Sequence, residues 1–393
     1  MLGNLLVGGV LAAFAAVISF SALKWFGEPY VWIFLTWACV FLCAVRLVPK
    51  ARTLWLILVL VSCVLAGLEG SLWISENWIY KDIKSEGTFR WINDDVLGYV
   101  ASKGIAQTET KSYRGKKLFD AVYTMDANGL RVSYPPGQSG NVHEPCILFF
   151  GDSYTFGWGL NDDQTLPYRV AIKTEGKYRV YNLGFPTHGP QQMLVELERD
   201  MVGRETGCAA PDIRYVIYVA MPDHVRRAAG LRDIDHRHGP RYELGKDGTV
   251  SYEGQFGEDR NKVEKIRSQL RKSILYRKLV GGDGIYYRRY NHDDITRYLA
   301  IVEAASKRIK SAYPNAEFDV LAWGNDALDK KKVLASEMIA GLTRKGLRVH
   351  VVEDILPGSS DNKPDYFLGG WDPHPNAMAN DRIAEYLVRK ILK

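Results

Sequence analysis

The sequence predicts an α/β domain with a mostly parallel five-stranded sheet, attached to a membrane anchor of three N-terminal helices. Three apolar runs, 5–23, 31–45 and 54–68, follow one another at the start of the chain. Beyond about residue 123, short apolar runs typical of buried strands alternate with longer helix-like patterns. Such alternation favours a parallel sheet covered by helices on both faces.

The anchor is predicted over residues 1–72. Its apolar runs approach the roughly 17–20 residues that a membrane span needs. Arg46, Lys50 and Arg52 lie between the second and third runs without an acidic residue, which places that loop and the N-terminus in the cytoplasm. A cleaved signal peptide is disfavoured because no basic region precedes the first run, and buried core helices are disfavoured because the runs lack a polar face. We expect a multi-pass protein of the cytoplasmic (inner) membrane with its large domain outside, in the periplasm of a Gram-negative cell.

Residues 73–122 are predicted to be a juxtamembrane linker. Aromatic residues in this stretch suit a membrane interface, among them Trp73, Trp78, Tyr80 and Trp91. A small basic cluster also lies here, formed by Lys111, Arg114, Lys116 and Lys117, and the favoured interpretation is a solvated surface. The net charge of +6 suits anionic glycans or lipid headgroups better than nucleic acid.

The large domain is predicted over residues 123–393. Its expected strands are 146–150, 178–183, 214–220, 318–323 and 347–353, and its expected helices are 164–175, 190–203, 294–313 and 377–391. Residues 225–293 interrupt the alternation with a tract rich in Arg and Tyr, including a predicted hairpin between Tyr242 and Tyr252. This insertion could line the rim of a site for sugars or anions, or it could be an ordinary exposed insertion.

Two segments far apart in the sequence carry candidate catalytic residues. Gly151-Asp152-Ser153-Tyr154-Thr155 follows a predicted buried strand, so Ser153 would lie at the carboxyl edge of the sheet, where ligands bind. Asp372 and His374 lie two residues apart in a loop-like segment before the last helix. A serine nucleophile needs a base, and the base needs an orienting carboxylate. The predicted triad is Ser153, His374 and Asp372.

These blocks resemble the SGNH, or GDSL-type, hydrolase superfamily, and a third match is Asn182-Leu183-Gly184. The flanking pattern is similar to that of members linked to bacterial cell-surface polysaccharides. The resemblance implies a flavodoxin-like three-layer fold and an oxyanion hole built from the N–H groups of Ser153 and Gly184. One block departs from the family, because Pro222 stands where an oxyanion-binding Asn is expected.

Several further residue roles follow from the resemblance. His224 or Asn325 could replace the missing oxyanion donor, although His224 could equally be structural. Substrate contacts are expected at residues in or beside the blocks, namely Asp152, Tyr154, His188 and His224. Cys146 and Cys208 are predicted to form a disulfide, because their strands are neighbours in the family's sheet and the compartment is oxidising.

The leading hypothesis is a membrane-anchored serine O-acyl esterase or acyltransferase, with acetyl as the expected group, acting on a cell-surface glycan. Polysaccharide-biosynthesis membrane proteins are candidate partners, and no cofactor or metal is expected. One alternative is a lipase or lysophospholipase at the outer leaflet. Another is a catalytically weak scaffold in an envelope polysaccharide assembly, which the absent third-block Asn favours.

Overall fold

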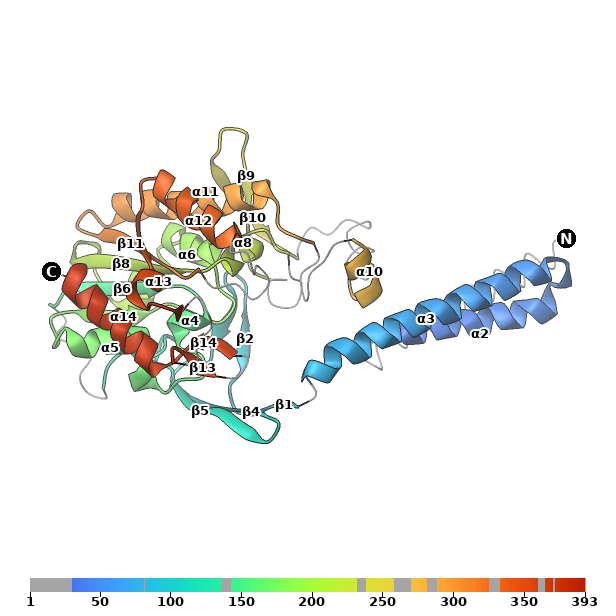
Figure 1. Cartoon of the computed structure of the whole chain (residues 1–393). Coiled ribbons are helices and arrows are strands. Elements are labelled where there is room, and N and C mark those ends of the chain that lie inside the picture. Colours follow the sequence, from blue (N-terminus) through green and yellow to red (C-terminus); the bar gives the residue numbers. More distant parts are fainter. Residues whose placement is uncertain are drawn as a thin grey trace. The chain divides into compact units, whose positions relative to one another are not determined.

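The computed structural model describes residues 30–80, 82–135, 143–231, 238–257, 270–280, 288–324, 333–359, 365–369 and 372–392 (Figure 1). The chain divides into two compact units. The first comprises Met1–Asp82 and Arg260–Arg289, and the second comprises Ile83–Asp259 and Tyr290–Lys393. The candidate catalytic residues all belong to the second unit.

A five-stranded parallel sheet forms the centre of the second unit. Its strand order is β12-β11-β8-β6-β7, and every neighbouring pair is parallel. The strands are β6 (Cys146–Phe150), β7 (Arg179–Asn182), β8 (Ile213–Ala220), β11 (Glu317–Ala322) and β12 (Arg348–Val351). The predicted sheet is confirmed, with strand limits that differ from the prediction by a few residues.

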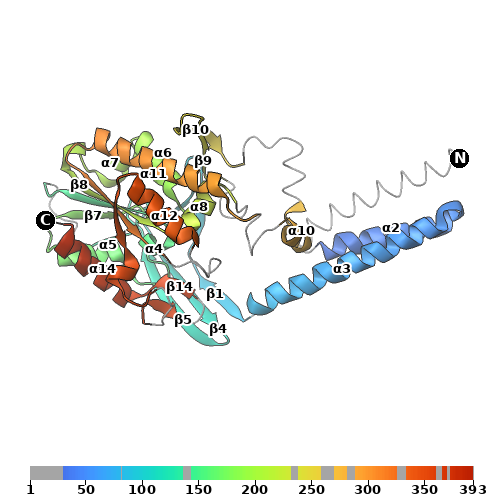
Figure 2. The same ribbon diagram turned by 45° about the horizontal axis from the view of Figure 1, so that its top comes forward.

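Helices cover both faces of this sheet (Figure 2). Alternate residues of β6 point to opposite faces, as in any strand: Leu148 and Phe150 pack on one side, and Ile147 and Phe149 on the other. The first side is covered by α6 (Pro190–Glu198), α8 (Asp223–Ala228), α11 (His292–Ala312) and α12 (Val333–Arg344). The second is covered by α5 (Leu166–Lys173), α13 (Val352–Ile355) and α14 (Ala377–Lys390). The result is the expected three-layer α/β architecture.

Two local predictions differ from the structure. The predicted helix 190–203 is divided into α6 and α7 (Met201–Thr206), because Asp200 between them adopts a left-handed backbone with φ 51°. The segment around His374 is a strand, β14 (Asp372–Pro375), paired with β13 (Phe367–Gly369). The four residues of β14 include two prolines and show no pattern typical of a strand. They form a strand only through pairing with β13.

Residues 83–124 form antiparallel sheets within the second unit, where the sequence predicted a linker. One sheet has the order β1 (Ile83–Gly87), β4 (Ala106–Tyr113), β5 (Lys116–Thr124), and the other pairs β2 (Trp91–Asp94) with β3 (Gly98–Ala101). Phe119 and Tyr123 of β5 pack with Phe156 and Phe185 in an aromatic core. Trp91, predicted at a membrane interface, packs edge-on against Phe185 at 5.5 Å.

The insertion 225–293 contains ordered elements in both units. In the second unit, β9 (Pro240–Leu244) and β10 (Val250–Gln255) form the predicted hairpin, with Tyr242 opposite Tyr252. In the first unit, α10 is a short helix (Ile274–Leu279). Other predicted features of this region, at residues 232–237 and 286–287, lie outside the described residues. Short 3-10 turns occur elsewhere, at Pro49–Ala51, Asp162–Gln164 and Ala210–Asp212.

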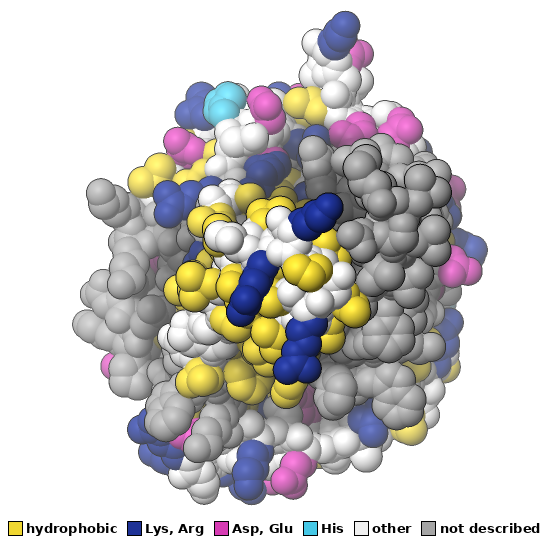
Figure 3. Space-filling model, turned by 90° about the vertical axis from the view of Figure 1, so that its right-hand side faces the viewer, with side chains coloured by type: hydrophobic (Ala, Val, Ile, Leu, Met, Phe, Trp, Pro, Cys, Tyr) yellow, Lys and Arg dark blue, Asp and Glu magenta, His cyan; other side chains and the backbone are white. Residues whose placement is uncertain are grey.

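The first unit contains an apolar hairpin of α2 (Val31–Leu47) and α3 (Arg52–Tyr80). Among the described residues, one helical stretch, Pro49–Glu76, has the length and apolar composition of a membrane span, and α2 is apolar but shorter. Figure 3 views the molecule from the right-hand side of Figure 1 and shows hydrophobic side chains gathered around a few Lys and Arg side chains. Three spans are therefore not confirmed, and the first predicted run lies outside the described residues.

Helix α3 continues beyond the predicted apolar run and includes acidic residues. Glu69 is fully buried and accepts hydrogen bonds from Ser273 Oγ at 2.8 Å and from the N–H groups of Ile274 and Leu275 at 2.8 and 2.9 Å. A carboxylate at a helix N-terminus satisfies N–H groups that have no partner within the helix. Glu69 therefore attaches α10 to α3.

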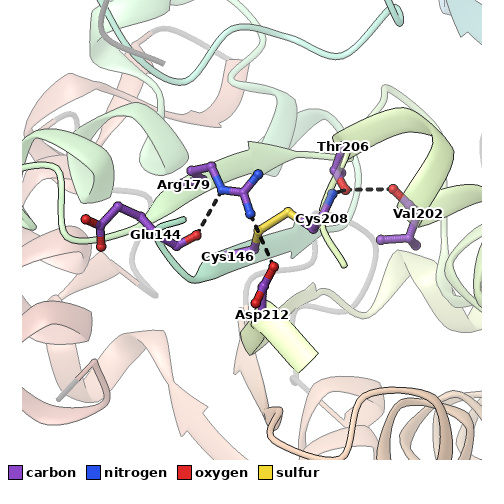
Figure 4. The surroundings of a disulfide bond; sticks show 7 residues. All are labelled: Glu144, Cys146, Arg179, Val202, Thr206, Cys208 and Asp212. Carbon is purple, nitrogen blue, oxygen red and sulfur yellow. Dashed lines mark hydrogen bonds and ion pairs between the residues drawn. A yellow bond between two sulfur atoms is a disulfide. The ribbon is translucent and has the colours of Figure 1, made fainter. Parts of the chain in front are cut away.

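A disulfide joins Cys146 and Cys208, the pair that the resemblance predicted, with Cα atoms 6.5 Å apart (Figure 4). Cys146 is the first residue of β6, which pairs with β8 from Ile213 onward, so the chain leading into β8 passes near β6. Beside it, Arg179 donates to the Glu144 carbonyl at 2.9 Å. The disulfide thus ties the N-terminal ends of neighbouring strands, at the edge opposite to Ser153.

Candidate active site

Ser153 is placed by a tight turn from β6 into the short helix α4 (Ser153–Phe156). Gly151 makes this turn with φ +153°, and a Cβ there would lie 2.2 Å from Thr155 Oγ1, so no larger residue fits. Asp152 caps the helix, because its Oδ1 accepts from the Tyr154 N–H at 3.0 Å. The turn leaves the Ser153 side chain at the carboxyl end of the strand, the position that the sequence predicted.

His374 and Asp372 come from β14, some 220 residues later in the chain. His374 Nε2 lies 2.9 Å from Ser153 Oγ, and His374 Nδ1 lies 2.5 Å from Asp372 Oδ1. The backbone N–H of His374 donates to the same carboxylate oxygen at 3.1 Å. The carboxylate keeps the proton on Nδ1, so Nε2 accepts from the serine hydroxyl. The structure therefore brings the three predicted catalytic residues together in the arrangement of a Ser-His-Asp triad.

The Asp372 carboxyl is held in its ionised form. Burial by itself would raise its pKa, but the hydrogen bonds from His374, the charge of His374 and the Lys111 ammonium outweigh burial and hold the pKa well below its ordinary value. The side chain of Asp372 is 1% exposed and that of His374 is 20% exposed. An ionised, buried carboxylate beside a partly open imidazole can stabilise the imidazolium that forms when the serine is deprotonated.

Tyr154, predicted to contact substrate, is buried against the triad. Its hydroxyl donates to the Pro373 carbonyl at 2.7 Å, and its ring lies 5.3 Å from the His374 ring and 5.2 Å from that of Trp323. The hydroxyl bond joins α4 to β14, so it couples the helix that carries the serine to the strand that carries the histidine. The structure thus places Tyr154 as a support for the triad.

Asp152 and His224, also predicted to contact substrate, belong to a buried charged network. Arg227 Nη1 donates to Asp152 Oδ2 at 2.8 Å, and His224 Nε2 lies 3.4 Å from the same oxygen, at the limit of a hydrogen bond. Burial would raise the pKa of Asp152, but Arg227 and His224 hold it below its ordinary value. Burial lowers the pKa of His224, whose Nδ1 contacts the Tyr218 hydroxyl at 2.7 Å. The structural interpretation of His224 fits this placement.

His188 is buried beside Gly184. Its Nε2 lies 2.8 Å from the Tyr99 carbonyl, and burial lowers its pKa to about 4. A cavity of about 90 Å³ is lined by His188, Gly184, Phe185, Glu196 and, among other residues, Val100 and Ala101 of β3. Neither Ser153 nor His374 is among the residues that line this cavity.

The two predicted oxyanion donors differ in availability. No acceptor among the described residues takes the Ser153 N–H, whereas the Gly184 N–H donates to Asn182 Oδ1 at 3.1 Å. A Cβ at Gly184 would lie 2.5 Å from Thr155 Cβ, so close packing against α4 by itself requires glycine here. His224 has both ring nitrogens facing protein groups, and Asn325 lies outside the described residues.

Two residues of β4 that the sequence did not single out as site residues lie beside the triad. Lys111 Nζ is 3.4 Å from Asp372 Oδ2. Burial raises the pKa of Glu109 to about 7, against the opposing charge of Lys111. The sequence showed Lys111 only as part of a basic cluster, for which the favoured interpretation was a solvated surface.

Among the described residues, no cluster of three His, Cys, Asp or Glu side chains has the arrangement of a metal site.

The contacts among Ser153, His374 and Asp372 have the arrangement of the catalytic triad of serine hydrolases. No protein-family model and no curated protein matches the chain. Solved structures similar to it include a lipolytic protein of the G-D-S-L family from Desulfitobacterium hafniense DCB-2, at 12% identity and TM-score 0.36, covering 63% of this chain and 99% of that one. Phospholipase A1 from Streptomyces albidoflavus NA297 is similar at 9% identity and TM-score 0.36, with coverage of 63% and 99%. The acetylxylan esterase Axe2 from Geobacillus stearothermophilus is similar at 12% identity and TM-score 0.35, with coverage of 64% and 95%.

Proposed function

We propose that this protein is a membrane-anchored serine O-acyl esterase or acyltransferase that acts on acetyl esters of a cell-surface glycan. The observation that carries the proposal is the continuous line of contacts from Ser153 Oγ to His374 Nε2 and from His374 Nδ1 to Asp372. Such a line activates a hydroxyl that is otherwise a weak nucleophile.

The reaction proceeds through an acyl-enzyme. Ser153 Oγ attacks the ester carbonyl while His374 Nε2 takes its proton, and the imidazolium is stabilised by Asp372. The Ser153 N–H faces the developing oxyanion. His374 then returns the proton to the leaving alcohol, and the ester C–O bond breaks. Water or a sugar hydroxyl, deprotonated by His374, attacks the acyl-enzyme and frees Ser153.

Apolar helices in the first unit support the membrane anchor. Large side chains along α3 are exposed to the surroundings, including Leu54, Ile57, Leu60 and Val64, and exposed apolar surface of this extent suits lipid. Glu69 lies 17 residues after Arg52, about 26 Å along the helix, close to the roughly 30 Å thickness of the hydrocarbon core. A buried, hydrogen-bonded carboxylate at the far boundary agrees with a span that begins at Arg52.

The first test is covalent. The full-length protein, purified in detergent, should react with a fluorophosphonate probe at Ser153 and hydrolyse p-nitrophenyl acetate, and Ser153→Ala and His374→Ala should abolish both. Ser251→Ala, at an exposed serine of β10, is the matched control and should react normally. A wild-type protein that neither reacts with the probe nor turns over acetyl esters, with or without glycan acceptors, would refute the enzymatic proposal and favour the scaffold.

A series of acyl chains then separates substrate classes. A steep fall in kcat/KM from acetate to octanoate supports an acetyl-ester substrate, whereas a rise with chain length supports a lipase. Retention of the protein in carbonate-washed membranes tests the anchor. External protease should digest the catalytic unit in spheroplasts but not in intact cells, and digestion in neither would contradict the proposed topology.

A further inference from the structure

Strand β4 places a lysine against the carboxylate of the triad. Lys111 Nζ lies 3.4 Å from Asp372 Oδ2, while His374 occupies the other oxygen, Oδ1. The side chains of Lys111 and Asp372 are 16% and 1% exposed. The two oxygens are therefore divided between the imidazole and the ammonium, and the pair lies where water screens charge poorly.

The position of Lys111 is set by the packing of the β4–β5 hairpin. Tyr123 of β5 is fully buried; its hydroxyl accepts from the Gly159 N–H at 3.0 Å and donates to Glu109 Oε2 at 3.2 Å. Glu109 and Lys111 are two residues apart on β4, so they point to the same face of the strand. The aromatic contacts of Tyr123 with Phe156 at 5.3 Å fix this face against the helix that begins with Ser153.

A solvent-exposed ion pair would contribute little to stability, because water screens both charges. Lys117 on the same hairpin makes such a pair with Asp120, with side chains 61% and 55% exposed. Lys111 differs because its partner is buried, ionised and bonded to the catalytic base. A change in this pair is therefore expected to act on His374 rather than on the surface alone.

We propose that Lys111 is a positioning residue of the active site, which holds the Asp372 carboxylate through Oδ2, the oxygen that does not contact His374. The inference rests on the proposed function, since it assigns Lys111 a role in the triad that function requires. The hairpin that supplies it belongs to the segment 83–124, so the catalytic site is completed by residues that precede the parallel sheet.

The proposal has a consequence for pH dependence. The charged and titratable groups around His374 are Asp372 on its own strand, Ser153 and Tyr154 on α4, and Lys111 and Glu109 on β4. The Lys111 cation disfavours a positive charge on the nearby imidazole, so its removal should favour the imidazolium form of His374. The deprotonated base is then available only at higher pH, and the acid limb of the pH–rate profile should move upward by about 0.5 to 1 unit.

The experiment measures the rate of fluorophosphonate labelling at Ser153 from pH 5 to pH 9 in the full-length protein, because this readout needs no identified acceptor. Lys111→Met should label roughly 10-fold more slowly at pH 7, in part because His374 is less well oriented. The acid limb of its pH–rate profile should shift to higher pH. Lys111→Arg should restore the wild-type limb, and Lys117→Met, the matched control, should leave rate and limb unchanged. Measuring the same variants with Glu109→Gln removes a carboxyl whose pKa burial raises to about 7.

The outcomes separate the two proposals. An unmoved acid limb in Lys111→Met, with wild-type labelling intact, would overturn the role of Lys111 and leave the proposed function standing. A wild-type protein that does not label at all would overturn the proposed function and this inference with it. If Lys111→Met does not fold, as judged by thermal unfolding, Lys111→Gln retains a hydrogen-bond donor without the charge and is expected to show the same shift.

Discussion

Replacing Asp372 by Asn tests the central arrangement of the site. Asp372 Oδ1 accepts two hydrogen bonds from His374, at 2.5 and 3.1 Å, and its side chain is 1% exposed. An amide of the same size keeps the packing but can turn its NH₂ toward His374, which would move the imidazole proton to Nε2, the atom that must accept from Ser153. In a serine protease the same change lowers kcat about 10⁴-fold. We expect a loss of 10³ to 10⁴ here, about 4–5.5 kcal/mol of transition-state stabilisation.

The assay compares kcat/KM for p-nitrophenyl acetate in the wild type, Asp372→Asn and Asp120→Asn. Asp120 also forms an ion pair with a lysine, but on the exposed hairpin with its side chain 55% exposed, so its substitution should change activity less than twofold. A loss below 10-fold in Asp372→Asn, with the protein folded, would refute the assignment of Asp372 as the orienting carboxylate.

The same variant tests how the contribution of Asp372 to folding stability changes at acid pH. Because the pKa of Asp372 is lowered in the folded protein, its contribution to stability is present above the ordinary aspartate pKa of about 4 and is lost as the pH falls below it. The stability difference between wild type and Asp372→Asn should therefore shrink between pH 5 and pH 3. A difference that stays constant over this range would contradict the lowered pKa.

Three further variants test the framework of the protein. Arg131→Leu should destabilise the catalytic unit by about 3–5 kcal/mol in chemical denaturation, because the buried guanidinium bonds four backbone carbonyls and Asp162; a loss below 1 kcal/mol would contradict it. Replacing Cys146 and Cys208 by Ser removes a crosslink with a sequence separation of 62 and should cost about 4 kcal/mol in the chain-entropy model, whereas a reduction-insensitive melting temperature in the wild type would show that the bond is absent. Glu69→Ala should make residues 270–280 more accessible to hydrogen exchange without changing esterase activity, and unchanged exchange there would contradict the capping of α10.

Much of the catalytic unit was predictable from local patterns. The five strands are short apolar runs, and the buried run Cys146–Phe150 ends at a glycine that no other residue can replace. Ser153, His374 and Asp372 could be nominated because their two local blocks, a strand-to-helix turn and a short Asp-Pro-His segment, together resemble the SGNH hydrolases. The contact between Ser153 and His374, over a separation of 221 residues, was expected from that resemblance.

The predictions that differed from the structure depended on groups that meet only in three dimensions. Asp152 and His224 were expected near the substrate, yet in the interior Asp152 accepts from Arg227 and His224 contacts the Tyr218 hydroxyl. Gly184 was assigned an oxyanion role, but its N–H meets the Asn182 side chain, and its lack of a Cβ is already required by Thr155. A sequence does not show whether a polar group contacts the substrate or another protein group, because both roles use the same residue types.

The sequence by itself determined the alternation of strands and helices and the apolar N-terminal runs, since each depends on hydrophobic periodicity. It also nominated the three residues of the triad, through blocks that resemble the SGNH hydrolases. Only the tertiary structure decided that residues 83–124 are part of the catalytic unit and that Lys111 reaches Asp372. Strand β4 is largely polar, AQTETKSY, so its pattern resembles that of a linker. The position of β4 is set by the aromatic core that packs against its partner β5. Such contacts join residues far apart in the chain, and no local sequence pattern predicts them.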